Sequence, residues 1–427
     1  MTQRRNVDAL LSEWDGRPSM ALVVLDQLST NVQALRHRVG SDTRFMAVVK
    51  AEGYGHGAVP IAKTAVRAGA DEVAVATVEE GVRLRRGGVT APILVLGPIG
   101  TKERPRAIAF DLMLVIGDPD FVRGLAADVR KTGRKTPLDV HLKVDTGMHR
   151  FGVCPERAVG VAKVIDAVPE LRLAGVMTHF ASADDPDAAS THMQAAMFDE
   201  AVAAIRAAGI EVSSEHLCNS AATLRYPEYH RDRVRVGISM YGLRPDPELV
   251  PVPDPIRPIM SVHSRITRIE ELQPGERVSY GGTWQAEAPS HVALVPIGYA
   301  DGYSRQGSNR AWVDVRGQRS PVRGRVCMDQ TMVEVGPDAR SGDIVTVIGD
   351  GQHGEAPSID ELAVLWGTIS HEVATGFAAR RLGHLYLQGG RLVAVADLWD
   401  YREIDEDAFA QPEIGEQDTT GVAQEAR

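Results

Sequence analysis

The feature that most constrains the fold of this chain is an alternation that continues from residue 45 to about residue 240. Short apolar runs rich in β-branched residues alternate with longer, often alanine-rich segments of helical spacing. The runs cover residues 45–49, 72–76, 92–96, 111–115, 139–144, 171–178, 215–218 and 234–236. Parallel strands need crossovers of about a dozen residues or more, which helices usually supply. The pattern predicts an α/β protein with a (β/α)8 barrel, and an open doubly wound sheet is the alternative.

The texture of the sequence changes past about residue 255. Strand-like segments close to Gly, Pro or Asp turns follow at residues 262–269, 292–297, 312–316, 331–335, 344–348 and 392–397. We therefore expect a barrel domain over residues 12–255, in which the helix-like segment 27–39 could complete the ring, and a mostly β domain over 256–398. The polar, acidic residues 399–427 predict a disordered tail.

Charge and cysteine content exclude several classes of protein. A net charge of −10 argues against a general nucleic-acid binder, and no run approaches the roughly 18 to 20 apolar residues of a membrane helix. Cys154, Cys218 and Cys327 are far apart and form no metal-ligand spacing, so we expect neither a disulfide framework nor a metal site. These observations predict a cytoplasmic protein without nucleic-acid or membrane partners.

Catalytic groups of a (β/α)8 barrel lie where strands end, at one rim. Lys50 directly follows the first run in VVKAEGYGHGA, where three glycines alternate with Tyr54 and His56. A lysine desolvated at such a rim can act as a neutral nucleophile and form a Schiff base. The glycines could also indicate a dinucleotide-binding loop, but their spacing is G-x-G-x-G and not G-x-G-x-x-G.

Other polar residues follow later runs, and each of them alone is compatible with a solvated or structural role. Arginine suits a carboxylate, and Ser220 resembles a helix N-cap in the region where this fold often binds phosphate. Together with Lys50, a phosphate cradle and two arginines at one rim fit pyridoxal phosphate. The residues at these strand ends are Lys143, Arg150, His179, Asn219, Ser220, Arg235, Gly237 and Ile238.

The motifs, in their order, resemble those of bacterial alanine racemases, which are fold-type-III pyridoxal-phosphate enzymes, over roughly residues 12–398. They are AVVKAEGYGHG, HLKVDTGMHRFGV, THFASAD, CNSAATLRYP, VRVGISMYGL, VSYGGTW, IGYADGY and GRVCMDQ. The resemblance implies a head-to-tail homodimer with shared active sites, an amino-acid substrate, pyridoxal 5'-phosphate as cofactor and D-alanine supply for peptidoglycan.

The resemblance also implies roles for single residues. Lys50 would be the Schiff-base lysine and one catalytic base, and Tyr280 of the partner subunit would be the other. Arg235 would face the pyridine nitrogen with His179 behind it, and Arg150 would grip the substrate carboxylate, helped by Met328 of the partner subunit. Lys143, which is often carbamylated in this family, would orient Arg150. Tyr54, Asn219, Ser220, Gly237 and Ile238 would hold the cofactor, and Tyr299 and Asp329 would support the site.

One position departs from the family pattern. His371, in GTISHEVATG, stands where members usually have a tyrosine that contacts the cofactor phosphate and lines the substrate entryway. Histidine is shorter and can titrate near neutral pH. A racemase of serine or of a broader set of amino acids is therefore an alternative function. A pyridoxal-phosphate-binding homologue without turnover is the alternative from another class.

Overall fold

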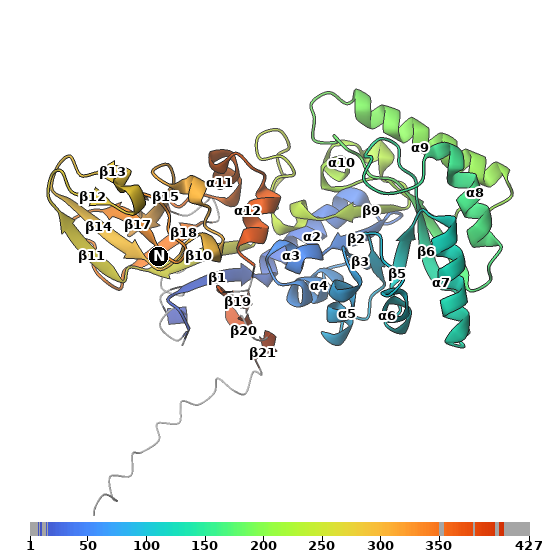
Figure 1. The fold of residues 1–427 in the computed structure, drawn as a ribbon, viewed down its shortest axis with the longest axis horizontal. Helices are drawn as coiled ribbons and strands as arrows, with labels where there is room; N and C mark the ends of the chain where they lie inside the picture. The colour runs from blue at the N-terminus through green and yellow to red at the C-terminus, as the bar shows by residue number, and fades with distance from the viewer. Residues whose placement is uncertain are drawn as a thin grey trace, which may run out of the picture.

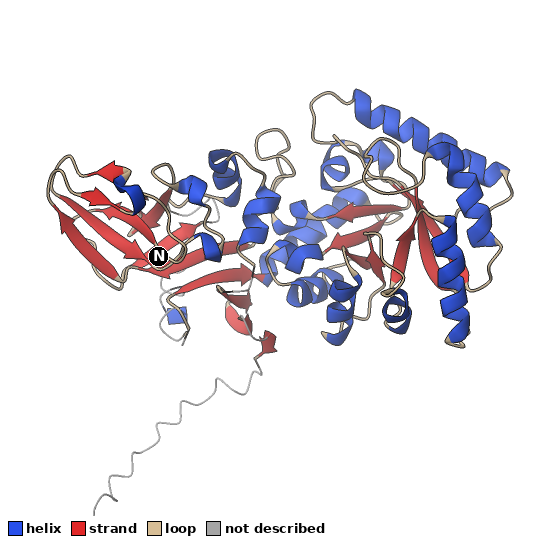
Figure 2. Ribbon diagram, viewed as in Figure 1, coloured by secondary structure: helices blue, strands red, loops and turns tan. Residues whose placement is uncertain are grey.

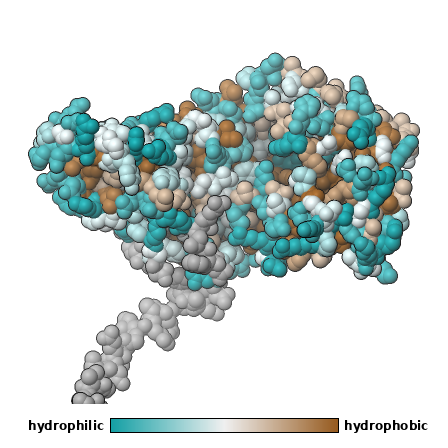
Figure 3. Space-filling model, in the orientation of Figure 1, coloured by the Kyte–Doolittle hydropathy of each residue, from teal (hydrophilic) through white to brown (hydrophobic). Residues whose placement is uncertain are grey.

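The structure is a computed structural model, and it describes residues 7, 9–10, 14, 16–349, 354–378, 381–397 and 401–404. Two parts are visible in Figure 1 and Figure 2, a barrel wrapped by helices and a part built mostly of strands. No helix within these described ranges is long and apolar enough to cross a membrane. The face shown in Figure 3 is mostly hydrophilic, with small scattered apolar patches.

The barrel consists of parallel strands in the order β8-β7-β6-β5-β4-β3-β2-β9. A backbone hydrogen bond from Arg235 N to Cys218 O, 3.1 Å long, joins the two ends of this sheet. The predicted (β/α)8 barrel is thus confirmed. Its strands are β2 (Arg44–Val48), β3 (Glu72–Val75), β4 (Ile93–Val95), β5 (Met113–Ile116), β6 (Leu138–Lys143), β7 (Leu171–Met177), β8 (Glu215–His216) and β9 (Arg233–Val236).

Helices cover the outside of the barrel because each buries one apolar face against the strands. The predicted helix before the first strand is present as α2 (Leu25–Val39), which packs beside α4 (Ala58–Arg67). The other helices are α3 (Lys50–Tyr54), α5 (Val78–Arg86), α6 (Arg104–Ala109), α7 (Pro119–Lys131), α8 (Pro155–Asp166), α9 (Ala189–Ala207) and α10 (Ser220–Arg225).

The second part contains an eight-stranded sheet in the order β16-β15-β18-β10-β1-β19-β20-β21, a three-stranded sheet β11-β14-β17 and the hairpin β12-β13. Helices α11 (Ile359–Trp366) and α12 (Ser370–Gly376) accompany them. The strands are β10 (Met260–Arg265), β11 (Arg268–Leu272), β12 (Arg277–Val278), β13 (Trp284–Gln285), β14 (Ser290–Val295), β15 (Trp312–Val315), β16 (Gln318–Pro321), β17 (Thr331–Val335), β18 (Ile344–Ile348), β19 (Gly383–Gln388) and β20 (Arg391–Ala396).

Two strands belong to the second part although the sequence places them outside residues 256–398. Strand β1 (Ser19–Val24) precedes the barrel in sequence, yet it pairs antiparallel with β10 and parallel with β19 in the second part. Strand β21 (Tyr401–Glu403) pairs with β20 inside the segment that the sequence predicts to be a tail. Residues 405–427 of that predicted tail lie outside the described residues.

Candidate active site

Lys50 lies at the end of β2, at the rim of the barrel. The residues after it do not form an ordinary helix, because Ala51, Glu52 and Gly53 all have left-handed backbone angles, with φ of 51°, 56° and 58°. The lysine is partly buried, and this burial together with the charge of Arg150 lowers its pKa. A lowered pKa increases the neutral, nucleophilic fraction of the amine.

Four cationic side chains gather around this rim: Lys50, Lys143, Arg150 and Arg235. None of them forms a salt bridge within the described residues, and only two carboxylates, Glu80 and Asp145, favour the charged forms of Lys50 and Lys143. Lys143 is buried, and burial with the charges of Arg150 and Arg235 lowers its pKa to about 8. Cations that outnumber the nearby carboxylates are costly unless a further anion neutralises them. The rim is therefore suited to an anionic ligand.

Arg235, near the end of β9, is held by three carbonyl oxygens. Its Nη1 donates to His216 O at 2.9 Å, and its Nη2 donates to Thr178 O at 2.8 Å and to Leu217 O at 2.9 Å. Nη2 also lies 3.3 Å from Nδ1 of His179, the residue that the family resemblance places behind this arginine. Burial lowers the pKa of Arg235 to about 10, so the guanidinium stays charged at neutral pH.

Two buried histidines lie behind Arg235 and are not among the site residues that the sequence predicts. His216 Nδ1 lies 3.1 Å from Arg235 Nη1, and His216 Nε2 lies 2.8 Å from Nδ1 of His141. Both histidines are fully buried. A histidine inside an apolar strand run, as in EHLC and DVHLKV, was the available signal, because a polar group at such a position needs a partner.

The predicted phosphate-binding residues come together beside Lys50. Ser220 Oγ accepts a hydrogen bond from Gly237 N at 2.9 Å, and Ile238 follows directly in the chain. Gly237 leaves room for Tyr54, because a Cβ on it would lie 2.3 Å from the tyrosine hydroxyl oxygen. The prediction that Ser220 caps the helix was wrong: Asn219 is the N-cap, its Oδ1 accepting from Ala222 N at 3.0 Å. Ser220 is thereby free to bind the Gly237 amide.

His371, on α12, also reaches this rim. Its ring centroid lies 5.8 Å from that of Tyr54, and burial together with the charge of Lys50 lowers its pKa to about 4. Its Nδ1 is buried and has no hydrogen-bond partner in the described part of the chain. A neutral histidine thus occupies the wall of the site.

The predicted residues of the second domain lie elsewhere. Tyr280, Met328 and Asp329 line one surface pocket, together with Ser279, Cys327 and Gln330. Tyr280 is 70% exposed and Met328 is 51% exposed. Figure 1 shows β12 and β13, which flank Tyr280 in sequence, at the end of the molecule away from the barrel. A single chain therefore does not bring Tyr280 to Lys50.

The loops that carry Tyr299 and Met328 are joined by backbone hydrogen bonds. Tyr299 N donates to Cys327 O at 3.1 Å, and Ala300 N donates to Met328 O at 3.0 Å. Gly298 permits this approach, since a Cβ there would lie 2.4 Å from both acceptor oxygens. Tyr299 and Met328 are thus held at a fixed spacing.

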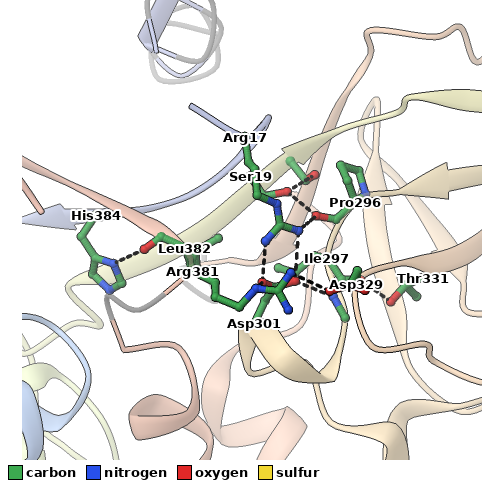
Figure 4. A network of polar contacts seen from close by, with 12 residues as sticks. Arg17, Ser19, Pro296, Ile297, Asp301, Asp329, Thr331, Arg381, Leu382 and His384 are labelled. Carbon is green, nitrogen blue, oxygen red and sulfur yellow. Dashed lines mark hydrogen bonds and ion pairs between the residues drawn. The ribbon is translucent and has the colours of Figure 1, made fainter. Parts of the chain in front are cut away.

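A polar network anchors the same loops (Figure 4). The buried carboxylate of Asp301 accepts from Arg17 Nη1 at 2.6 Å and from Gly298 N at 3.0 Å. Arg381 lies 3.7 Å from Asp301 Oδ1 and binds Asp329 Oδ1 at 2.6 Å. Asp301 therefore connects β1's leading segment to both loops.

Comparison with known proteins gives a consistent result. Models of the N-terminal and C-terminal domains of alanine racemase match residues 23–245 and 259–384. An alanine racemase of a Nostoc species is 42% identical over 370 residues, covering 86% of this chain and 95% of the relative. Alanine racemase 2 of Bacillus subtilis is 39% identical over 379 residues, covering 88% and 96%.

Solved structures agree with these sequence relatives. The alanine racemase from Bacillus anthracis with bound L-Ala-P has a TM-score of 0.83 and 35% identity, covering 89% of this chain and 98% of that one. The alanine racemase from D-cycloserine-producing Streptomyces lavendulae has the same TM-score and identity, covering 88% and 98%.

Proposed function

The chain belongs to the alanine racemase family, and on that premise we propose that it interconverts L-alanine and D-alanine with pyridoxal phosphate bound at the barrel rim. The observation that carries this proposal is the set of four cations at the rim, none of which forms a salt bridge among the described residues. Such a set suits the cofactor's phosphate and the substrate's carboxylate, and the amine of Lys50 suits covalent attachment.

The residues at the rim fit the cofactor. Ser220, Gly237, Ile238 and Tyr54 form a compact cradle for a phosphate, with Gly237 too close to the Tyr54 hydroxyl for any larger residue. When bound, pyridoxal phosphate supplies an electron sink for the charge that develops at the substrate's α-carbon. Arg235 would hold the ring nitrogen and, because arginine only donates, would keep that nitrogen unprotonated.

Racemisation needs an acid/base group on each face of the α-carbon. Lys50 would serve one face. Tyr280 would serve the other from the partner subunit, since it is exposed on the second domain and is not brought to the Lys50 of its own chain. A phenol needs neighbouring cations to act as a base near neutral pH, and the rim supplies them. This assignment requires a homodimer with shared sites.

The remaining roles follow the same arrangement. Arg150 would bind the substrate carboxylate with Met328 of the partner subunit, and Lys143 would orient Arg150. Tyr299 and Asp329 would line the entry on the partner's side. We also propose that the enzyme acts in the cytoplasm and supplies D-alanine for peptidoglycan, in keeping with its three free cysteines.

His371 favours one second candidate, a racemase that also accepts serine or larger amino acids. Its ring lies beside Tyr54 and is smaller than the family's usual tyrosine, and its Nδ1 has no hydrogen-bond partner among the described residues. A smaller side chain at the wall would leave more room for a substrate side chain.

The test is a chiral amino-acid assay on the purified protein with added pyridoxal phosphate. We expect alanine to racemise with the highest kcat/KM, and Lys50→Ala to lose both turnover and the visible absorbance of the bound cofactor. Lys131→Ala, which changes an exposed surface lysine, is the matched control. Binding of cofactor without turnover of any amino acid would instead establish a non-catalytic homologue.

A further inference from the structure

The turn that follows Lys50 has an unusual backbone. Five consecutive residues, Ala51 to Gly55, have positive φ values of 51°, 56°, 58°, 53° and 85°. Three of them carry a Cβ, for which the left-handed conformation is unfavourable. Such a segment persists only when surrounding contacts hold it in place. The contacts that hold this turn therefore also determine where Lys50 lies.

The contact nearest to Lys50 comes from Glu80 in the first turn of α5. Glu80 Oε1 accepts from Ala51 N, the amide directly after Lys50, at 2.6 Å. Its Oε2 accepts from Ala76 N at 2.7 Å and from Thr77 N at 3.1 Å. One carboxylate thus ties the end of β2 to the end of β3. Other contacts hold the far side of the turn, where Arg83 pairs with Glu52.

Glu80 is also the negative charge that acts on Lys50. The cation of Arg150, from the loop after β6, opposes the charged form of Lys50, and Glu80 favours it. The other titratable groups facing the lysine are His179 after β7, His371 on α12 and Tyr54 in its own turn. None of these three is an anion at neutral pH.

We propose that Glu80 is a positioning residue for Lys50: its carboxylate locks the left-handed turn by binding the Ala51 amide, and its charge offsets part of the surrounding positive charge. This inference rests on the proposed role of Lys50 as the lysine that binds the cofactor. Glu80 contacts neither substrate nor cofactor in this account and acts only through the lysine.

The variant Glu80→Gln tests whether the Glu80 carboxylate positions Lys50. A glutamine has one acceptor oxygen and one donor group, so it cannot accept from both Ala51 N and the amides of Ala76 and Thr77. It also removes the charge. Because a negative charge raises the pKa of a nearby amine, its loss should lower the pKa of Lys50 further.

Two controls distinguish positioning from helix capping. Thr77→Ala removes the other half of the capping box, the bond from Glu80 N to Thr77 Oγ of 3.3 Å, and leaves the Glu80 carboxylate in place. Glu79→Gln makes the same charge change one residue away, at an exposed position that pairs with Arg106 at 3.5 Å.

The first measurement is reductive methylation of Lys50 in the cofactor-free protein, followed by peptide mass spectrometry across a range of pH. For Glu80→Gln we expect the labelling midpoint to fall by about half a pH unit or more, and for both controls we expect no change. The second is cofactor release from the holoenzyme, which we expect to be about tenfold faster only in Glu80→Gln.

A Glu80→Gln protein that matches Thr77→Ala in both the labelling midpoint and the release rate would overturn the inference and leave Glu80 as a helix cap. Failure of the proposed function would look different, because the unmodified protein would then neither retain the cofactor on Lys50 nor racemise alanine. Thermal unfolding of all variants shows whether each one is folded.

Discussion

Arg235 on β9 and His216 on β8 are hydrogen-bonded, with 3.1 Å between Nη1 and Nδ1. Since arginine only donates, Nδ1 of His216 must be the acceptor, and the proton of neutral His216 is on Nε2. That proton points to Nδ1 of His141 at 2.8 Å, so His141 carries its own proton on Nε2, which has no partner within the described residues. One arginine thus fixes the tautomers of two histidines.

These buried histidines predict acid sensitivity. Burial, with the charges of Arg233 and Arg235, lowers the pKa of His141 to about 3. As pH falls below about 6.5, the unfolded chain binds a proton at this position and the folded protein does not, so the folded state loses up to about 1.4 kcal/mol per pH unit. We expect the free energy of unfolding in urea to fall from pH 6.5 to pH 4.

The variant His141→Gln isolates this contribution, since glutamine can still accept from His216 and does not titrate. Between pH 6.5 and pH 4, unfolding of this variant should bind about one proton less than unfolding of the unmodified chain. The slope of its unfolding free energy against pH should be correspondingly smaller. Identical slopes for His141→Gln and the unmodified chain would show that His141 does not titrate on unfolding.

Asp301→Asn should weaken the second half of the site. Asp301 now accepts hydrogen bonds from Arg17 and from the Gly298 amide. The amide nitrogen of asparagine would face one of these donors, which would lose its hydrogen-bond partner. We expect a loss of about 2 kcal/mol in unfolding free energy and a raised KM, because the Tyr299 loop loses its anchor. Asp329→Asn is the comparison variant. Because the ion pair of Asp329 with Arg381 is half-exposed, we expect this variant to lose under about 1 kcal/mol of unfolding free energy. Equal unfolding free energies for Asp301→Asn and the unmodified chain would remove Asp301 from this role.

Tyr280→Phe should separate proton exchange from racemisation. L- and D-alanine have equal free energies, so kcat/KM in the two directions must fall together and cannot assign the bases. In deuterated water we expect one enantiomer to keep exchanging its α-hydrogen through Lys50, while conversion to the other falls about a hundredfold or more. Undiminished racemisation would exclude Tyr280 as a base.

His371→Tyr should narrow the range of substrates. Tyrosine would fill more of the wall beside Tyr54, so kcat/KM for serine relative to alanine should fall, by about tenfold if His371 sets the available space. The ratio is measured by chiral chromatography with each amino acid in turn. An unchanged ratio would show that residue 371 does not set the preference.

The barrel could be predicted from the sequence because strands buried on both faces are continuous apolar runs, and each strand from β2 to β9 overlaps its predicted run. Strand β1 could not be placed in this way. Its partners β10 and β19 lie more than two hundred residues later, and nothing local indicates that pairing. Residues 262–269 were predicted as one strand, whereas the chain turns between β10 and β11.

The site, too, contains residues that the sequence predicts and residues that it does not. Lys50 and Arg235 could be found because each stands at or near the end of a strand run, where the barrel places its chemistry. The runs that contain His216 and His141 indicate buried polar groups but not their partners, and nothing local to Glu80 indicates that it binds the Ala51 amide. Tyr280 was assigned by family resemblance, and its distance from the barrel within one chain became visible only in the fold.

Whether each site combines Lys50 of one subunit with Tyr280 of the other is tested most directly by mixing two inactive variants. Lys50→Ala and Tyr280→Phe proteins are purified separately, combined, and allowed to exchange subunits. A mixed dimer has one site with both lesions and one intact site, so the mixture should regain roughly a quarter of wild-type racemase activity. If both residues served the same chain's site, every site in the mixture would carry a lesion, and activity would stay at the level of the separate variants.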